Sequence, residues 1–510
     1  MSFGGIRGVM RRLAILVALA APGPWAAAAA WAGPDHHRAP DIGLPAAYDA
    51  PAGAASLSAA QLDRWWLLFN DDELNRLEDE AAMSAPDART QAARVLEAKA
   101  TRDSATAQTL PTGNIQGNVS RQHAYNIGGA SNSLFPIGGV TDTATANLDV
   151  SWELDLFGRL REARRIANAD LAEAHFDIEG VRASLAASVA DSYFQAKGYA
   201  IQLSDARETV RIDASLLSIA QRKADLGLGA QADADQVAGE LAQARSQLED
   251  LDAQLHIAQR QLLILVGRGV DLAASLPIDA QAPDAPKPPA ALPGDLLSRR
   301  PDIRESEAHL RAQAGTGRLR HLAIFPTFTL LPGLGLSSTA SPGVAFIPPT
   351  TLVPAQQTTD LGFWTLGAGV SVPVLDIPRL LYDAKAEDAR TEQAVIAYEK
   401  TVQTAYGEAE NALVNLGAGE RAVSVLVEGE ARSRRAFEDA QKSYALGLDD
   451  LSTVLSAEQT WRATRTALTG ERVQVLRRAV QTYKALGGGW AFADAGTSIQ
   501  TAPAKGARPQ

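Results

Sequence analysis

The sequence predicts an α+β fold made of two similar halves, each combining long helices with a pair of amphipathic strands. Three observations carry this prediction: an internal repeat along the 510-residue chain, long tracts without proline, and four segments in which apolar and polar residues alternate. Of the residues, 46% are hydrophobic and 21% are charged. The chain therefore has ample apolar material to bury and does not resemble a disordered polyampholyte.

The repeat is visible as short motifs that return in the same order at nearly constant spacing. The PDAR motif at 86–89 returns as PDIR at 301–304, and the LGL triplet at 226–228 returns at 446–448. The two separations, 215 and 220 residues, are almost equal. A period of this length is too long for a solenoid unit. We therefore expect two comparable halves that lie side by side.

Prolines set the limits of the helices. The chain has 26 prolines, yet none lies between Arg159 and Leu276 or between Arg379 and Ala502. Such tracts, rich in Ala, Leu, Gln, Glu and Arg, are what long helices require. The predicted helices cover residues 74–108, 159–225, 231–266, 295–322, 380–445 and 450–487. In each half the two shorter helices together match the long one, so a hollow cylinder of antiparallel helices about 100 Å long fits these lengths.

Four segments alternate between apolar and polar residues with the period of two that is typical of a strand. Two are clear, at 144–156 and 364–374, and shorter partners precede them at 114–120 and 328–336. The apolar face of the two clear segments carries Leu148, Val150, Trp152, Trp364, Leu366 and Val370. The long connections at 122–142 and 338–360 are rich in Gly, Ser, Pro and Thr, and we expect them to be exposed loops.

This alternation leaves two kinds of sheet open. It is the pattern of a transmembrane barrel strand, but a soluble sheet with one buried face alternates in the same way. Four strands cannot close a barrel, for which about eight are the practical minimum. Since an open edge cannot lie in lipid, membrane strands would have to be pooled between chains, and three copies would supply twelve.

The segment 1–32 has the features of a secretory signal peptide. Three arginines precede an apolar stretch, and the Ala-Trp-Ala triplet at 30–32 is a cleavage site, so we expect export and a cut before Gly33. The chain contains no cysteine, which excludes disulfides, thiol chemistry and lipid attachment through cysteine. A formal net charge of −11 argues against nucleic acid as a partner, because such binding needs basic patches.

The organisation expected along the chain has six parts. They are a signal peptide at 1–32, an extended leader at 33–58, a first repeat at 59–276, a proline-rich linker at 277–294, a second repeat at 295–490 and a disordered tail at 491–510. No enzyme is expected, and neither is a cofactor or a bound metal. The seven histidines form no H-E-x-x-H motif, and neither a phosphate loop nor a G-x-S-x-G elbow is found.

Three segments resemble the TolC-like outer-membrane factors, in the branch often called NodT. They are LLSRRPDIRESEAHLRAQAGTGRLRHLAIFPTFTL at 296–330, WWLLFNDDELNRLEDEA at 65–81 and SWELDLFGRLR at 151–161. The resemblance implies an α+β membrane protein: a trimer with a 12-stranded β-barrel in the outer membrane of a Gram-negative bacterium, continuing into a long periplasmic α-helical barrel. In such a trimer the apolar strand residues face lipid.

The resemblance also implies a function and partners. Members of the family are exit channels of tripartite efflux or type I secretion systems and pass small molecules from the periplasm to the exterior. The implied partners are two further copies of the chain, a periplasmic adaptor of the membrane fusion type, an inner-membrane transporter of RND type, and the lipid bilayer. The alternative is a periplasmic coiled-coil adaptor or scaffold without its own pore, which would have one helical hairpin and no duplicated strands.

Both LGL triplets lie at the far end of the long helices, where we expect the adaptor to dock. The expected docking residues are Leu226, Gly227, Leu228, Leu446, Gly447 and Leu448. The family often has Asp in the following helix, where carboxylates ring the closed mouth, but Thr453 and Ser456 stand at these positions. Asp449, Asp450, Asp233 and Asp235 are candidate substitutes beside the aperture. The same four residues could equally be solvated helix caps.

Overall fold

The structure, a computed structural model, describes residues 40, 42–49, 59–125, 139–287, 293–347 and 351–489. The predicted signal peptide at 1–32, most of the leader at 33–58 and the predicted tail at 491–510 lie outside the described residues. So do residues 126–138 and 348–350 of the two predicted loops.

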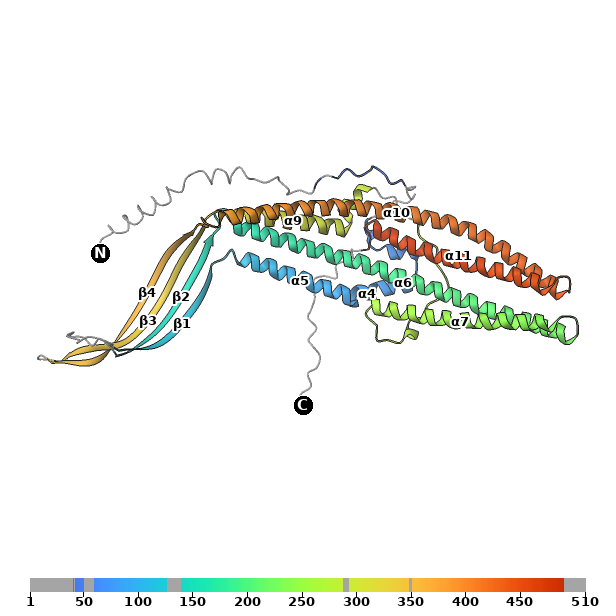
Figure 1. Cartoon of the computed structure of the whole chain (residues 1–510), viewed down its shortest axis with the longest axis horizontal. Helices are drawn as coiled ribbons and strands as arrows, with labels where there is room; N and C mark the ends of the chain where they lie inside the picture. The colour runs from blue at the N-terminus through green and yellow to red at the C-terminus, as the bar shows by residue number, and fades with distance from the viewer. Residues whose placement is uncertain are drawn as a thin grey trace. The chain divides into compact units, whose positions relative to one another are not determined.

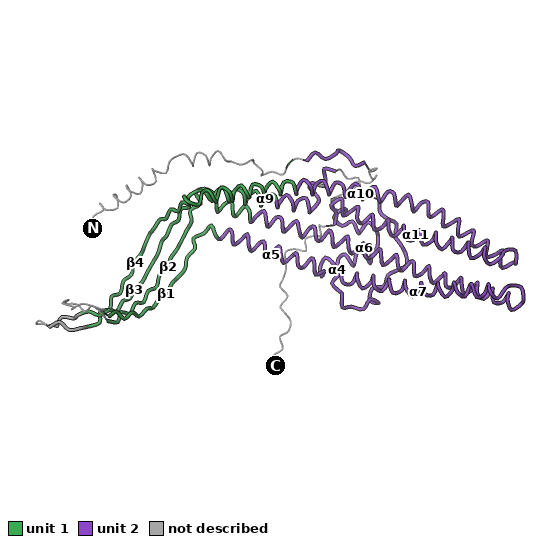
Figure 2. Tube along the Cα trace, in the orientation of Figure 1, with its two compact units in different colours: residues 1–40, 108–166, 310–396 green, residues 41–107, 167–309, 397–510 purple. Residues whose placement is uncertain are grey.

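The chain divides into two compact units, and each unit draws on both halves of the repeat (Figure 2). Unit 1 comprises residues 1–40, 108–166 and 310–396, and unit 2 comprises residues 41–107, 167–309 and 397–510. The division therefore does not follow the order of the repeats along the sequence. The boundaries predicted for the two repeats remain a prediction.

Unit 1 contains an antiparallel sheet that, within the described residues, has four strands in the order β1-β2-β3-β4 (Figure 1). The strands are β1 (Thr112–Ala124), β2 (Gly139–Leu154), β3 (Thr327–Ile347) and β4 (Thr351–Ser371). Each half of the repeat supplies two neighbouring strands. The four predicted strands are confirmed, and in one chain the sheet has open edges at β1 and β4.

The second predicted loop, 338–360, is mostly strand. Residues 338–347 pair with 351–360, so the hairpin of β3 and β4 extends much further than expected. Gly, Ser and Thr composition did not exclude a strand, because these residues leave backbone pairing intact and Thr favours it. Pro342 lies beyond Ala340, the last residue of β3 that pairs with β2. Within the described residues, no β2 residue pairs with β3 beyond Ala340, so the missing N–H of Pro342 breaks no pairing with β2.

Two long helical hairpins lie mainly in unit 2 (Figure 1). The first consists of α6 (Arg159–Asp225) and α7 (Gln231–Leu265), and the second of α10 (Ile377–Ala445) and α11 (Leu451–Ala485). All four helices were predicted to within a few residues. Among the described residues, no helix has both the length and the apolar character needed to cross a membrane.

The shorter helices differ from prediction at prolines. The single helix expected at 74–108 is wrong, because α4 (Asp72–Ser84) and α5 (Pro86–Ala107) are separate. Ala85 between them has an extended backbone, with φ −57° and ψ 130°, since Pro86 disfavours helical geometry in the residue before it. Pro301 likewise begins a new helix. The remaining elements are α3 (Ala59–Asp63), η1 (Trp65–Phe69), η2 (Ala273–Ser275), η3 (Pro293–Asp295), α8 (Leu296–Arg299) and α9 (Pro301–Leu322).

The described part of unit 2 has two apolar clusters. In the larger one, Trp65 and Trp66 of η1 are fully buried, and the Trp65 ring stacks on Tyr483 with centroids 5.8 Å apart. The smaller one lies between the hairpins. It contains Ile212, Leu216, Val237, Phe437, Ala440, Tyr444, Leu451, Val454, Leu455 and Trp461. This second cluster joins α6 and α7 to α10 and α11.

Candidate functional site

The first candidate surface is the apolar face of the sheet in unit 1. In an antiparallel pair, residues directly opposite each other share a face. Ile115 pairs with Leu148, Leu148 with Leu334, and Leu334 with Trp364, so one apolar row crosses all four strands. The same register places Leu148, Val150, Trp152, Trp364, Leu366 and Val370 on one face. These side chains are partly to largely exposed in the single chain, and Trp364 is 73% exposed.

The apolar face has a limited height. Along β2 it covers residues 146–154, which matches the roughly 9–11 residues that a transmembrane strand needs. Beyond it, on the same face, Arg121 Nε donates to Asp142 Oδ1 at 2.6 Å and Asp360 follows on β4. The opposite face carries mostly polar residues, such as Asn114 opposite Asp149. The sheet therefore has one apolar band that ends in charged residues.

The second candidate surface is at the ends of the two hairpins in unit 2. Each LGL triplet ends a helix in a Schellman turn. In the first turn, Gly227 N donates to Ala224 O at 2.9 Å and Leu228 N donates to Lys223 O at 2.8 Å. Gly447 and its neighbours make the same pair of bonds in the second. The glycines have φ of +65° and +75°, which only glycine adopts without steric cost.

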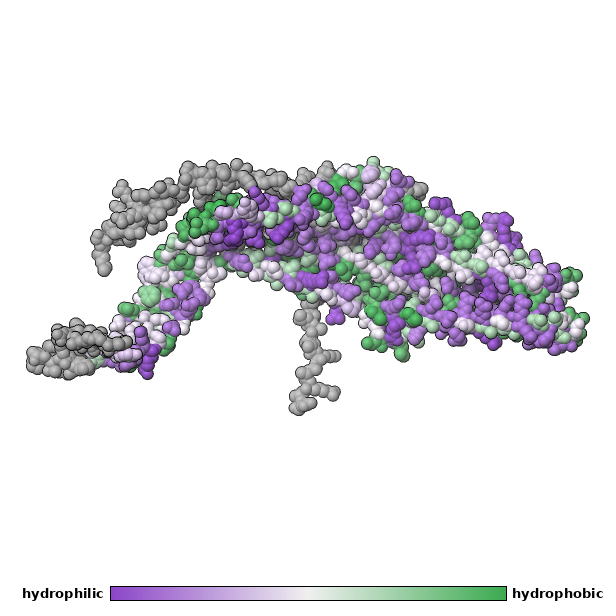
Figure 3. Space-filling view, viewed as in Figure 1, coloured by the Kyte–Doolittle hydropathy of each residue, from purple (hydrophilic) through white to green (hydrophobic). Residues whose placement is uncertain are grey.

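The leucines of both turns are exposed. Leu226 is 72% exposed, and Leu228, Leu446 and Leu448 are each 75% exposed. Figure 3 shows hydrophobic side chains at the ends of the hairpins, beside the hydrophilic surface of the helices. The structure thus brings the six predicted docking residues to the ends of two neighbouring hairpins.

A direct link joins the two ends, and the sequence did not reveal it. Lys223 Nζ donates to Tyr444 O at 2.8 Å and lies 3.7 Å from the centroid of the Tyr444 ring. Burial and the nearby Asp233 carboxylate raise the pKa of Tyr444 above its ordinary value. Lys223 has no matching lysine in the second half, where Ser443 stands at the equivalent position. The repeat therefore gave no signal for this contact.

The candidate aperture carboxylates have different surroundings. Asp450 is the N-cap of α11, where its Oδ1 accepts bonds from Thr453 N at 2.9 Å and Thr453 Oγ1 at 2.7 Å. These bonds lower the pKa of Asp450. Asp449 and Asp235 are exposed, while Asp233 is half-buried near Tyr444. Asp450 therefore caps α11. Both bonds from Thr453 are accepted by Oδ1, and Oδ2 accepts neither of them.

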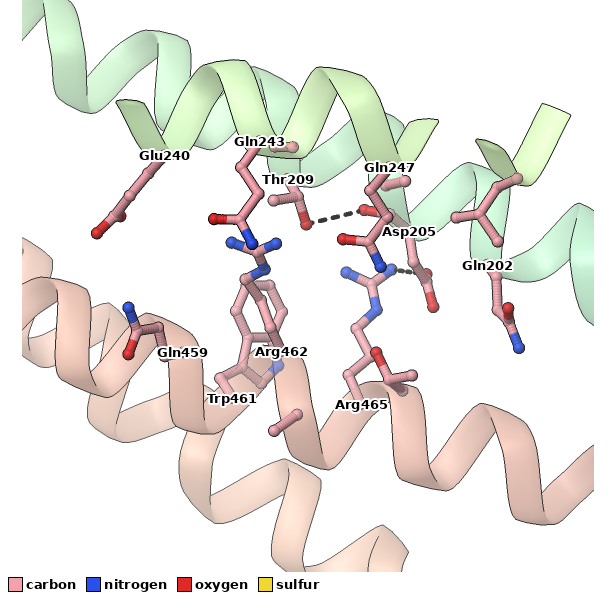
Figure 4. Close-up of a pocket in the computed structure, with 15 residues that line it drawn as sticks. Gln202, Asp205, Thr209, Glu240, Gln243, Gln247, Gln459, Trp461, Arg462 and Arg465 are labelled. Carbon is pink, nitrogen blue, oxygen red and sulfur yellow. Dashed lines mark hydrogen bonds and ion pairs between the residues drawn. The ribbon is translucent and has the colours of Figure 1, made fainter. Parts of the chain in front are cut away.

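A polar cavity of about 340 Å³ lies among α6, α7 and α11 in unit 2 (Figure 4). Arg465 forms an ion pair with Asp205, and its guanidinium lies 5.4 Å from the centroid of the Trp461 ring. Trp461 Nε1 donates to Glu430 at 2.9 Å. The amides that line the cavity are Gln202, Gln243, Gln247 and Gln459. These contacts tie α6 to α11 and α11 to α10, so they connect the two hairpins.

An open sheet with one apolar band and two long helical hairpins define the class of outer-membrane channels that pool strands between chains. Comparisons agree with this class. The family model described as outer membrane efflux protein matches residues 77–268 and 292–488. Among curated relatives, the pyoverdine export outer membrane protein OpmQ of Pseudomonas aeruginosa is 30% identical over 440 residues, covering 86% of this chain and 90% of OpmQ.

Further relatives extend this agreement. The cation efflux system protein CusC of Escherichia coli is 27% identical over 427 residues, covering 84% of this chain and 88% of CusC. The solved structure of the outer-membrane channel OprN superposes with a TM-score of 0.75 at 26% identity, covering 90% of this chain and 99% of OprN.

The chain belongs to the outer membrane efflux protein family. It is an outer-membrane exit channel of an efflux system in a Gram-negative bacterium, with the TolC-like α+β fold of a trimeric β-barrel channel. The resemblance seen in three sequence segments is confirmed. The alternative of a coiled-coil adaptor without its own pore does not agree with this family, which is one of channels and not of enzymes.

Proposed function

We propose that the channel exports small molecules delivered by an RND-type inner-membrane transporter through a periplasmic adaptor, and that the adaptor docks on the two LGL turns. By their names, OpmQ exports pyoverdine and CusC exports cations, which favours small molecules over secreted proteins as the exported class. The observation that carries the docking proposal is the exposure of four leucines at the ends of both hairpins. Exposed apolar clusters of this kind mark interaction sites.

The chemistry of the turns suits a helical partner. The glycines permit the positive φ of each turn, and the two Schellman hydrogen bonds hold the turn in one tight conformation. The leucines therefore project from a fixed backbone. Three chains would present six such turns. An adaptor with a helical hairpin could place its own apolar residues between them, in the manner of a helix in a groove.

The membrane-facing surface is proposed to be the apolar band of the sheet. In a barrel of twelve strands the band would form a continuous ring, because each chain contributes the same rows. The support is the register, which joins Ile115, Leu148, Leu334 and Trp364 in one row. The polar face would then line the water-filled interior.

Exchange of the turn glycines tests the docking proposal. Gly227→Val and Gly447→Val would force a β-branched residue to positive φ, at a cost of about 1–2 kcal/mol each. We expect trimers to reach the outer membrane, while efflux and crosslinking to the adaptor are lost. Gly239→Val on α7 is the matched control, because no neighbouring atom lies within 4 Å of its Cβ position and its φ is not positive. If the turn variants pump as well as this control, docking lies elsewhere.

A further inference from the structure

Two carboxyl groups face each other in the interior between the hairpins. Asp213 lies on α6 and Glu458 lies on α11, and each residue is 1% exposed. Within the part of the chain that the structure describes, Asp213 Oδ1 and Oδ2 and Glu458 Oε1 receive no hydrogen bond from a donor. The Glu458 carboxyl is within hydrogen-bonding reach of Asp213. Three buried acceptor oxygens without a donor require an explanation, because such groups are nearly always paired.

The surroundings are apolar and supply little positive charge. Both residues belong to helices of the smaller apolar cluster. Ile212 precedes Asp213, and Leu216 and Leu455 lie about one helical turn from Asp213 and Glu458. On α11 itself, the nearest cation is Arg462, whose Nη1 lies 3.9 Å from Glu458 Oε1. That separation is too long for a hydrogen bond.

The neighbouring helices α7 and α10 carry further carboxylates. From α7, the half-buried Glu240 acts on both Asp213 and Glu458. From α10, Glu430 accepts a hydrogen bond from Trp461, which follows Glu458 by about one turn of α11. The Arg462 guanidinium acts on both Glu458 and Glu240 and, like Glu240, lines the polar cavity, whereas Asp213 and Glu458 are each 1% exposed. Full ionisation of Asp213 and Glu458 would leave two like charges in contact at low dielectric.

A single shared proton resolves this conflict. If one carboxyl is protonated, its O–H donates to the other, and both groups gain a charge-assisted hydrogen bond. Burial, together with the facing Asp213 carboxyl, raises the pKa of Glu458 to about 8. The packed hairpins therefore hold the proton more tightly than separated hairpins do, where Glu458 would have its ordinary value.

We propose that Asp213 and Glu458 share one proton and act as a pH-sensitive latch that holds the α6–α7 hairpin against the α10–α11 hairpin. The direction follows from linkage. Below the ordinary pKa of a glutamate, both the packed and the separated state are protonated, and the latch is complete. As pH rises from there to about 8, the separated state releases its proton first, so packing weakens. Above about 8 the packed state has also lost the proton, and no further change occurs.

The first test detects the proton itself. The buried Glu78 carboxyl also has a raised pKa, so the relevant signal is the infrared spectrum of the wild-type trimer minus that of the Glu458→Gln trimer. At neutral pH this difference should contain the carbonyl absorption of a protonated carboxyl, which should disappear with a midpoint near pH 8. Glu458→Gln should remove it, because the new amide donates to Asp213 and leaves that carboxylate ionised. A difference spectrum without this absorption, or with an absorption that does not change up to pH 9, would overturn the proposal.

The second test measures hairpin separation. Since the chain has no cysteine, Leu228→Cys and Leu448→Cys place one spin label on each hairpin end, and labelled chains are diluted into unlabelled trimers. We expect the distance distribution to shift to longer values as pH rises from about 5 to 8. In Glu458→Gln and in Asp213→Asn this shift should vanish, because each amide supplies a donor at any pH.

Glu428→Gln on α10 is the matched control. Its carboxylate is 66% exposed and pairs with Arg432 one turn away, so the wild-type pH response should remain. The proposal fails if the wild type shows no shift, or if both pair variants shift as it does. The outcome does not depend on adaptor docking, since no partner is present. Because Glu458→Gln and Asp213→Asn are both measured, the proposal can still be tested if one of the two variants misfolds.

Discussion

The two hairpins have the same turn but differ in how the helix after it begins. Gly227 and Gly447 form equivalent Schellman turns with positive φ. The N-cap residue of α7, after the first turn, is Ala230, which makes no side-chain cap bond. At the equivalent position of the second hairpin, Asp450 accepts from Thr453 N and caps α11. The duplication therefore preserved the turn, which sets the reversal of the chain, while the adjoining cap diverged.

The bodies of the two long helices differ as well. Lys197 on α6 is almost fully buried, and its Nζ contacts Asp71 at 2.8 Å and Asp279 at 2.6 Å. It thereby ties α6 to the N-cap of α4 and to the proline-rich segment after α7. At the equivalent position on α10 the chain has Gly417. The first half therefore carries an internal anchor at a position where the second half has no side chain to form one.

The largest effect is expected from removing this anchor. Lys197→Met leaves Asp71 buried without its cation, which should cost about 3–5 kcal/mol. The measurement is thermal unfolding of the purified trimer. Lys442→Met on α10 is the control, because that lysine is 71% exposed and lies 3.7 Å from Asp439, so the expected change is below about 0.5 kcal/mol.

A second substitution sharpens the interpretation. Adding Asp71→Asn to Lys197→Met removes the lone charge but keeps a residue that can cap α4. Part of the lost stability should return. If Lys197→Met is as stable as Lys442→Met, the first half has no special anchor and this part of the comparison is wrong.

The next largest effect is expected from arginine substitutions in β2 and β4, which belong to different halves of the repeat. Leu148→Arg on β2 and Leu366→Arg on β4 both lie within the apolar band, so each should cost about 2–4 kcal/mol if the band spans the bilayer. Val370 pairs with Phe328 at the end of the band, and Val370→Arg should cost only about 0–1 kcal/mol. Folding into lipid vesicles, followed by denaturant titration, measures these differences.

Substitutions on the other face provide the controls. Asp149→Asn and Ser371→Asn lie on the polar face and should assemble as the wild type does. If the arginine variants on the apolar face fold as stably as the asparagine variants on the polar face, the assignment of the band is wrong. A large loss for β2 but none for β4 would show that the halves do not contribute equally to the membrane surface.

Much of this architecture could be predicted because it depends on local sequence. The limits of α6 follow from a proline-free tract with a glycine turn after it, and the predicted range 159–225 is the observed one. The paired strands follow from alternation. Local composition failed where it was ambiguous: one proline divided a predicted helix, and a Ser- and Thr-rich segment at 338–360, expected to be a loop, was mostly strand.

The buried polar contacts could not be predicted in the same way. Lys197 meets Asp71, Asp213 meets Glu458, and Lys223 meets Tyr444 only after helices from distant parts of the chain have packed together. Their partners depend on the rotation and register of those helices, which no spacing along one helix specifies. The repeat did not help, because none of these side chains recurs at the equivalent position in the other half.

The smallest effect is expected at Asp450, where one pair of substitutions distinguishes its role as the N-cap of α11 from its proposed charge at the aperture. Asp450→Ala removes both the cap and the carboxylate, whereas Asp450→Asn keeps the cap, since asparagine caps about as well as aspartate. Asp450→Ala should therefore lose about 1 kcal/mol of stability relative to Asp450→Asn, and Ala230→Asp should gain a similar amount at the first hairpin.

Single-channel recordings measure the effect of the charge on conduction. If Asp450 and Asp449 line the aperture, Asp450→Asn and Asp449→Asn should both reduce cation selectivity without affecting adaptor docking. Unchanged selectivity in both would leave Asp450 as a cap alone, and unchanged stability in Ala230→Asp would mean that the first helix start is already satisfied by water.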